Sequence, residues 1–596
     1  MVSRIPAWTW DKLLRLVDRP RLGLRLALLS TLLASPALLL DFHLDDHIGR
    51  YIYSEREGAA RLFHNYAGGY GLALGDAAEN HWQMDRGWAP WWQYDRLLVR
   101  AFRPLGVLIH SIDFRYLLDS PVLMRAHSLL WAALLVLAVT RMYRAVFASA
   151  AIAGAAAVLF ALDHTRGLAI GHICNRHALE ATTIGALTLT AHFRYGRTRR
   201  WAHAWQGPAL YAVGMFASEL SMSVSAYVVA FELLAQRDAA RVRAFAVAPY
   251  LAVTLAFVAF YAAAGYGVSG SGYYIDAARE PGPYLLAFLM RAPLLLMGQF
   301  AGPPAELALE LPPALAYGLL AWALALLALV GWALRPVFRR DPTARFWALG
   351  MVGCLVPAAG ADPSNRQLVF ASLGAMGLLA QAWEFYASSP RGPASGLPRG
   401  GHGLAGLLLS FRLVVSPLMF PLSTVSIALA APINAQASQF ATEPVGGRDV
   451  IFVTSPYEMA VRIAYLFRHL SGEPLPSSVR YLASGPQATT LRRTGPNTLE
   501  AAFEGGLLQS RYLHLHRDPR LKMPVGAVVK LSGFSVEVLA TSQASGPTRV
   551  RFTFAKPLED PSLAFYRWDE RQFVPFTPPG VGQERTLPAA LMPVGW

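Results

Sequence analysis

The fold is decided by "LGLRLALLSTLLASPALLLDFHLDDHIGRY" (residues 22–51), an apolar run that ends in a cluster of acids and imidazoles. Residues 22–40 are long enough for one membrane-spanning helix, which needs about 20 mostly apolar residues. The seven residues after Leu40 then include three aspartates and two histidines, namely Asp41, His43, Asp45, Asp46 and His47. The stretch predicts a membrane span whose end carries an unusual number of titratable groups.

The composition places the whole chain in a membrane. Of its 596 residues 54% are hydrophobic and only 15% are charged, whereas a soluble chain has about 25% charged residues. Mean hydropathy is +0.33, and apolar runs recur as far as about residue 433. We therefore expect a polytopic helical protein, because helices satisfy their own backbone in lipid. The net charge of +15 does not indicate nucleic acid, since the arginines occupy short loops between apolar runs, as membrane orientation requires.

The alternation of apolar runs and basic loops predicts about 11 spans. Basic residues between positions 4 and 25 place the N-terminus in the cytoplasm, so that residues 41–122 form the first extracytoplasmic loop. We interpret the apolar stretch 284–301 as re-entrant or interfacial, because a span there would put the later basic loops on the wrong side. The Gly/Pro/Ser-rich linker 388–403 marks a cytoplasmic turn. The predicted spans are 22–40, 124–146, 147–163, 170–193, 206–219, 220–235, 244–264, 314–334, 346–360, 367–386 and 403–432.

The C-terminal part changes character. "DVIFVTSP", "SVRYLASG", "VVKLSGFSVEVLATS" and "TRVRFTFAKPL" are typical of strands with turns, and "YEMAVRIAYLFRHLSG" is typical of a helix that ends at Gly472. We expect an all-α transmembrane bundle over residues 1–433 and an extracytoplasmic α+β or β-sandwich domain over residues 434–596. The Trp-rich "GWAPWW" (87–92) in the first loop predicts contact with lipid headgroups.

The acid pair at Asp45 and Asp46 supports two interpretations. Carboxylates next to lipid are costly unless they are paired or functional. Two adjacent carboxylates can hold a divalent cation, or one can act as a base that the other orients. Alternatively, they are polar residues at a helix C-terminus that meet water, although the helix dipole disfavours acids there.

Several segments, taken in order, resemble the GT-C superfamily of membrane glycosyltransferases. That superfamily includes protein O-mannosyltransferases, lipid A aminoarabinose transferases and oligosaccharyltransferase catalytic subunits. "LDDHIGRY" (44–51) is similar to its acidic motif after the first span, with the tyrosine displaced to Tyr51. Residues 102–137, 157–182, 216–234 and 362–380 resemble its later segments, with Thr165 and Ser218 where proline and lysine are common. The resemblance covers most of residues 22–386 and implies a bacterial branch with a GT-C-like fold.

The resemblance also implies an activity, an inverting transfer of a hexosyl or pentosyl group from a polyprenyl-phosphate donor to an extracytoplasmic acceptor. Asp45 is then the general base and Asp46 orients it or binds metal, and the reverse assignment stays open. Arg103, Arg176 and Arg366 bind the phosphate; interfacial snorkelling or structural ion pairing is the alternative. Asp46, His164 and Glu219 hold a divalent metal, Mg²⁺ or Mn²⁺. The alternatives are a hydrogen-bonded His164 and a Glu219 that pairs with an arginine.

A second class of function stays open, that of a non-catalytic transporter, flippase or assembly subunit for envelope polysaccharide. A transporter is expected to carry charged residues or broken helices deep in several spans, often in repeated halves. The acids here gather at the predicted outside ends of spans, which favours the transferase. The Ala/Arg/Gly-rich composition indicates a bacterium, which predicts an inner-membrane protein with a periplasmic or extracellular tail. The expected partners are the lipid bilayer, the lipid-linked sugar and an acceptor glycan, lipid or protein.

Overall fold

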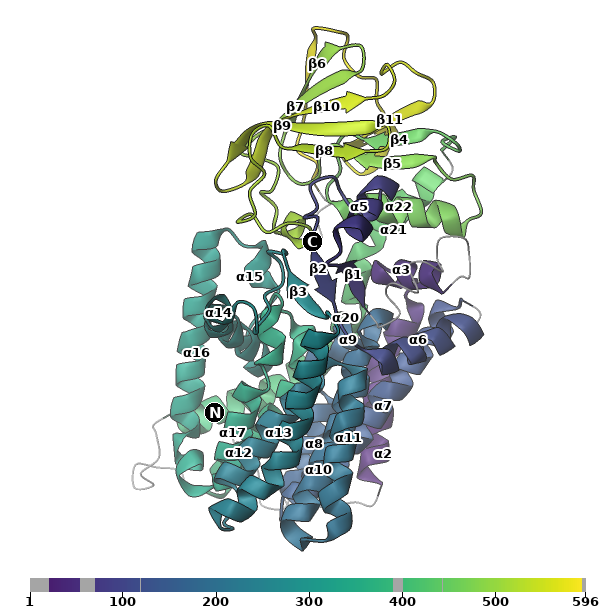
Figure 1. Cartoon of the computed structure of the whole chain (residues 1–596). Helices are drawn as coiled ribbons and strands as arrows, with labels where there is room; N and C mark the ends of the chain where they lie inside the picture. The colour runs from purple at the N-terminus through teal and green to yellow at the C-terminus, as the bar shows by residue number, and fades with distance from the viewer. Residues whose placement is uncertain (1–20, 54–69, 118, 390–399, 442, 592–596) are drawn as a thin grey trace. The chain divides into compact units, whose positions relative to one another are not determined.

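The computed structural model describes residues 21–53, 70–117, 119–389, 400–441 and 443–591. The chain divides into two compact units (Figure 1). The helical unit comprises Met1–Asp41, Phe102–Ala264 and Pro281–Ile427, and the β-rich unit comprises Phe42–Ala101, Gly265–Glu280 and Ala428–Trp596. The basic N-terminal residues before position 21 and linker residues 390–399, which entered the topology prediction, lie outside the described residues.

The helical unit is built from long helices joined by short turns and 3₁₀ helices. The helices that correspond to predicted spans are α2 (Leu22–Ala34) with its 3₁₀ extension to Leu39, α7 (Pro121–Val146), α8 (Ala150–Ala161), α10 (Arg176–Thr198), α11 (Trp201–Ala217), α12 (Ser223–Leu234), α13 (Ala240–Ala263), α16 (Pro313–Arg340), α17 (Pro342–Gly353), α18 (Val369–Ser388), α19 (Gly401–Ser410) and α20 (Ser416–Val425). A π-helical turn, Phe411–Val415, joins α19 to α20. The remaining helices are α6 (Pro104–Tyr116), α9 (Gly167–Gly171), α14 (Pro281–Phe300) and α15 (Leu307–Glu310).

Among the described residues, seven helical segments are long and apolar enough to cross a membrane, and the protein is a multi-pass membrane protein. They are Leu22–Leu39, Pro121–Val146, Ala240–Ala263, Pro281–Phe300, Pro313–Arg340, Asn365–Ser388 and Gly401–Leu429. In α16 only 11% of the apolar window is buried within the protein, so its surface suits lipid rather than water. The count of about 11 spans stays a prediction. Of the stretch predicted to be re-entrant or interfacial, 284–301, residues 284–300 belong to one helix, α14.

Glycines allow the inner helices of this unit to approach one another closely. Trp347 of α17 is fully buried and packs among Phe346, Tyr143 and Phe193, with ring centroids 4.3, 5.6 and 6.4 Å away. A Cβ at Gly377 of α18 would lie 2.7 Å from the Trp347 ring. The indole therefore occupies the space that a larger residue at position 377 would need.

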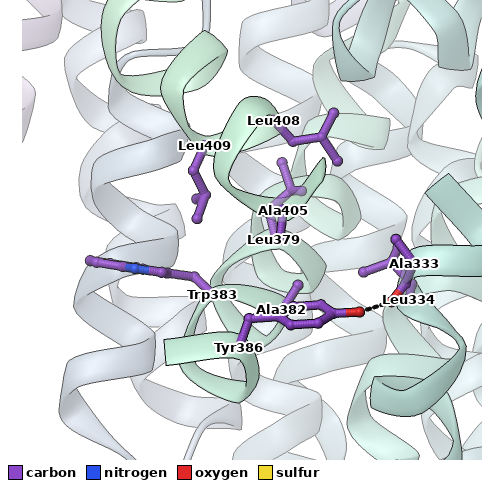
Figure 2. A pocket seen from close by; sticks show the side chains of 9 residues that line it. All are labelled: Ala333, Leu334, Leu379, Ala382, Trp383, Tyr386, Ala405, Leu408 and Leu409. Carbon is purple, nitrogen blue, oxygen red and sulfur yellow. Dashed lines mark hydrogen bonds between the residues drawn. The ribbon is translucent and has the colours of Figure 1, made fainter. Parts of the chain in front are cut away.

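A small apolar hollow lies among α16, α18 and α19 (Figure 2). Tyr386 crosses it and donates its hydroxyl hydrogen bond to the carbonyl of Ala333. Its lining consists of Ala333, Leu334, Leu379, Ala382, Trp383, Tyr386, Ala405, Leu408 and Leu409. This lining offers packing for apolar atoms and no acid, base or nucleophile suited to catalysis.

The β-rich unit contains three sheets. A six-stranded antiparallel sheet has the order β13-β6-β7-β10-β9-β8, and a four-stranded sheet has the order β12-β11-β4-β5, in which β4 is parallel to both of its neighbours. A third antiparallel sheet joins β1 (Gly71–Leu74), β2 (Leu98–Arg100) and β3 (Gly267–Ser269). The other strands are β4 (Asp449–Phe452), β5 (Ser478–Tyr481), β6 (Thr489–Gly495), β7 (Thr498–Phe503), β8 (Val528–Leu531), β9 (Phe534–Ser542), β10 (Gly546–Phe554), β11 (Leu563–Asp569), β12 (Gln572–Pro575) and β13 (Glu584–Leu587).

Alternation of apolar and polar residues produces the core of the six-stranded sheet. Phe552 of β10 pairs with Leu499 on one side and Val536 on the other, and all three are fully buried. The cross-strand contact of these side chains stabilises the register, because a slip by one residue would turn them to the other face. The prediction of a β-rich C-terminal part, with a helix after its first strand, is confirmed. That helix is α22 (Glu458–Leu470), and α21 (Ala431–Ala441) precedes the first strand.

The first loop contributes to the same unit as the C-terminal part, through α3 (Asp45–Ile52), α5 (Ala77–Arg86) and the Trp-rich segment. Trp91 and Trp92 are buried in the core of the β-rich unit, and the Trp91 indole N–H donates to the carbonyl of Leu482 at 3.2 Å. The prediction that "GWAPWW" lies at the lipid headgroups is therefore wrong for these two residues. Their indoles pack in a protein core, where burial of a large ring contributes more than an interfacial position would.

We expect Gly377→Ala to lower the thermal unfolding midpoint, although alanine favours helix by about 1 kcal/mol over glycine. The added methyl would overlap the Trp347 ring, and overpacking typically costs about 1–3 kcal/mol. Gly406→Ala in α19 is the matched control, because a Cβ there meets no atom within 4 Å. Thermal unfolding of both variants in detergent checks this, and an unchanged or raised midpoint for Gly377→Ala would contradict it.

Candidate functional site

The acid pair lies in the first turn of α3, in the β-rich unit. Leu44, at φ 49°, precedes this eight-residue helix, so the chain turns sharply before Asp45. Asp45 is exposed, whereas Asp46 is fully buried and its Oδ2 accepts a hydrogen bond from the His43 amide at 3.2 Å. Acids are favoured at a helix N-terminus, where the dipole is positive. The pair thus begins a separate helix, and the sequence interpretation that placed it at a helix C-terminus is wrong.

Two C-terminal residues that the sequence analysis did not select lie near Asp45. The Tyr457 hydroxyl is buried and has no hydrogen-bond partner among the described residues. Burial raises the pKa of Tyr457 well above its usual range, and the neighbouring carboxylates of Glu458 and Asp45 add to the effect. Tyr457 stays a neutral phenol beside an exposed carboxylate and can donate a hydrogen bond there. Its only signal in the sequence is a position between a strand and a helix.

In the helical unit, Arg103 and Glu219 form an ion pair. Arg103 Nε donates to Glu219 Oε2 at 2.8 Å, and Nη2 donates to Oε1. The remaining guanidinium nitrogen, Nη1, lies 3.0 Å from His177 Nε2. Arg103 directly precedes Pro104, the first residue of α6, and Glu219 begins the 3₁₀ helix Glu219–Met222 between α11 and α12. The turn positions thus bring together two residues that lie 116 positions apart in the sequence.

A group of basic side chains surrounds His177 in the first turn of α10. Arg103, His110, His172 and Arg366 all lie close enough to His177 to act on it electrostatically. We call these five residues the basic cluster. The structure thus brings two predicted phosphate-binding residues, Arg103 and Arg366, into one neighbourhood that also holds three imidazoles.

Arg366 is the least constrained member of the basic cluster. It is half-buried on the 3₁₀ helix Asn365–Leu368. Its side-chain hydrogen bond within the described part of the chain is a long one, 3.4 Å to Asn175 Oδ1. Asn175 in turn contacts His172 Nδ1 at 2.8 Å. A guanidinium held this loosely keeps donors free for an anionic ligand.

The third predicted phosphate ligand, Arg176, has protein partners on every side. Its Nη1 pairs with Asp113, Nε donates to Ser128 Oγ at 2.9 Å, and Nη2 donates to the Met124 carbonyl at 2.7 Å. Arg176 and Asp113 are fully buried, and His127 Nδ1 contacts Asp113 at 2.6 Å. This geometry is that of a structural ion pair, which was the alternative for Arg176.

His164 lies beside a second buried ion pair. Its Nδ1 is 2.9 Å from Ser416 Oγ. The neighbouring carboxylate of Asp163 accepts from Arg412 Nη1 at 2.7 Å and from Ser372 Oγ at 2.6 Å. Arg412, on the π-helical turn, thereby has the carboxylate partner that a buried guanidinium in an apolar helix requires.

The predicted metal ligands differ in how many of their donor atoms are already engaged by other protein groups. Glu219 directs both carboxylate oxygens at Arg103, and His164 Nδ1 is engaged by Ser416. Glu219 therefore offers no free oxygen, whereas the second ring nitrogen of His164 could still bind a metal, and the metal role of both residues stays a prediction. Asp45 and Asp46 provide carboxylate oxygens of the kind that Mg²⁺ and Mn²⁺ prefer. The metal role of Asp46 stays a prediction.

The chain has weak structural similarity to known proteins and no match in sequence. No family model and no curated protein sequence matches the chain. Among solved structures, a crystal structure of the Archaeoglobus fulgidus oligosaccharyltransferase tethered to an acceptor peptide with the NVT sequon has a TM-score of 0.41 and 14% identity, covering 78% of this chain and 64% of that one. The apo form of the same enzyme gives 0.38 and 12%, covering 77% and 65%. The chain thus spans just under two thirds of the length of these structures.

We expect Arg176→Met to destabilise the protein by about 3–5 kcal/mol, because it leaves the Asp113 carboxylate buried without its cation. Arg176→Met combined with Asp113→Asn should recover much of this loss, since no unpaired charge then remains. Arg366→Met is the matched control and should change stability little, given its exposure and its long hydrogen bond. Chemical denaturation of the detergent-solubilised variants measures all three. A single Arg176→Met variant as stable as wild type would show that Arg176 is not a structural partner.

Proposed function

We propose that the protein is a GT-C-type membrane glycosyltransferase that moves a sugar from a polyprenyl-phosphate donor to an extracytoplasmic acceptor, with inversion. The observation that carries the proposal is the basic cluster, in which Arg103 and Arg366 share the surroundings of His177. A lipid-linked sugar phosphate offers the negative charge that such a cluster can bind. The order of motifs in the sequence supports the same class of reaction.

Arg366 and Arg103 bind the phosphate in this proposal. When the bond between the sugar and the phosphate breaks, negative charge accumulates on the phosphate, and guanidinium groups stabilise it by charge-assisted hydrogen bonds. Arg366 has free donors, while Arg103 is oriented by Glu219 and His177. Arg176 contributes least to phosphate binding, because its guanidinium already contacts Asp113, Ser128 and Met124.

The acid pair supplies the base. Asp45, the exposed member, accepts the proton of the acceptor hydroxyl, whose oxygen then attacks the anomeric carbon. The bond from that carbon to the phosphate oxygen breaks, and the electron pair leaves with the polyprenyl phosphate. General-base assistance of this kind contributes about 10²–10⁴ in rate. Asp46, buried and bound to the His43 amide, orients the pair; the reverse assignment of the two roles stays open.

A divalent ion, Mg²⁺ or Mn²⁺, completes the proposal, with Asp46 as the residue that would hold it, together with His164 and Glu219. Such an ion would act as a Lewis acid toward the phosphate oxygens. We place the protein in a bacterial inner membrane, with a cytoplasmic N-terminus and a periplasmic or extracellular C-terminal part. The transferred group is a hexosyl or pentosyl residue, and the acceptor is a glycan, a lipid or a protein of the cell envelope.

Asp45→Asn and Asp46→Asn should each lower the turnover of polyprenyl-phosphate sugars by about 10²-fold or more, because an amide cannot take the hydroxyl proton. Asp41→Asn is the matched control, since Asp41 is an exposed aspartate just before the acid pair. The measurement is consumption of a panel of donors by purified protein in lipid nanodiscs, with and without EDTA. Full activity of the Asp45 and Asp46 variants would move the base elsewhere. A wild type that consumes no donor across the panel would favour the transporter, flippase or assembly role instead.

Arg366→Gln should raise the KM for the lipid-linked donor and lower kcat/KM by about 10–100-fold, because it removes a charged hydrogen bond to the phosphate. Arg345→Gln is a matched control, since its side chain is exposed on α17, outside the basic cluster. Initial rates at varied donor concentration in nanodiscs check the prediction. An unchanged KM with Arg366→Gln would remove Arg366 from the donor site.

A further inference from the structure

The side chain of Asn434, in α21, contacts residues on both sides of the acid pair in the sequence. Its Nδ2 donates to the carbonyl of Phe42 at 2.5 Å, and its Oδ1 lies 3.1 Å from His47 Nε2. A carbonyl only accepts, so the amide nitrogen must face Phe42 and the amide oxygen must face His47. His47 therefore carries a proton on Nε2 and donates to Asn434. One amide group thus connects the residue directly after Asp46 to the residue three positions before Asp45.

The helix that carries the acids is short and depends on tertiary contacts. An isolated helix of eight residues is not stable in water. Ring contacts with α22 hold α3 in place, because His47 lies 4.6 Å from Phe467 and Tyr51 lies 4.6 Å from His469 between centroids (Figure 1 shows α3 against α22). The polar contacts of Asn434 act at the start of the helix, where the two carboxylates project.

The backbone between the two contacts is a closed turn. Leu44 takes a positive φ of 49°, and Asp46 Oδ2 accepts from the His43 amide. This turn connects Phe42 and His47 to the acid pair through a few residues, so we expect release of either contact to displace the carboxylates. A displacement of about 1 Å at a reacting group can reduce a rate by about 10²-fold.

We propose that Asn434 is a positioning residue, which fixes the Asp45–Asp46 carboxylates by binding Phe42 and His47 on either side of them. The effect on catalysis rests on the proposed function, whereas the effect on the order of residues 42–52 does not. Asn434 acts through the turn and makes no contact with the sugar or the phosphate.

Hydrogen–deuterium exchange of the intact protein in nanodiscs tests the proposed effect of Asn434 on the order of residues 42–52. In Asn434→Ala the amides of residues 45–52 should exchange faster, by up to about 30-fold, the ratio that two hydrogen bonds of typical net strength give. Asn497→Ala is the matched control, because Asn497 also donates from Nδ2 to a backbone carbonyl, that of Phe554 at 2.7 Å, but within the six-stranded sheet. Unchanged exchange in Asn434→Ala overturns the inference.

Kinetic measurements test the proposed effect of Asn434 on catalysis. Asn434→Ala should lower kcat by about 10–100-fold with less than about a twofold change in donor KM, since the phosphate ligands are untouched. His47→Phe keeps a ring against Phe467 but loses the bond to Asn434. Combined with Asn434→Ala, it should give less than the sum of the two single losses in kcat, because both remove one interaction. If Asn434→Ala fails to fold, the single His47→Phe variant tests the same interaction.

The outcomes separate the two proposals. Faster exchange with lowered kcat supports the positioning role, and faster exchange with unchanged kcat overturns it. Additive losses in the double variant overturn the link between Asn434 and His47. If wild type consumes no donor, the proposed function fails, and the exchange result alone then decides whether Asn434 orders the acid pair.

Discussion

Paired charge is the constraint on which the helical unit depends. A guanidinium or carboxylate in the middle of apolar helices is costly unless a partner of opposite sign lies beside it. The chain meets this requirement with Arg176 on Asp113 and with Arg412 on Asp163, both fully buried. Each pair joins helices that are distant in sequence, 63 and 249 positions apart. Each pair therefore fixes the contact between two segments that are far apart in the chain.

The basic cluster differs from these pairs in its charge balance. The cluster holds two arginines and three imidazoles, and Arg103 binds both carboxylate oxygens of Glu219. Basic groups held this close repel one another when charged, and a bound anion relieves that repulsion. The concentration of basic side chains distinguishes the cluster from the two ion pairs.

Sequence periodicity and propensity were enough to predict the long helices, the β-rich C-terminal part and the helix α22, because these are local properties. The acid pair was recognised for its composition, but its place at the start of α3 was not, since Leu44 takes a positive φ that no pattern indicated. Arg176 and Arg103 look alike in sequence. Only their surroundings distinguish them: Arg176 pairs with the fully buried Asp113, whereas Arg103 pairs with Glu219 inside the basic cluster. Trp91 and Trp92 misled the prediction because their burial depends on segments that lie about 390 residues later in the chain, as the 391-residue separation of the Trp91–Leu482 bond shows.

The composition of the β-rich unit, assembled from three separated segments, has a consequence for biosynthesis. The Phe42 carbonyl meets Asn434 across 392 residues. At a translation rate of about 5–20 residues per second, these partners are synthesised roughly 20–80 s after the first loop. During that time Trp91, Trp92 and the α3 segment lack the C-terminal residues that they contact in the folded unit. A chain that ends before residue 428 therefore cannot complete the β-rich unit.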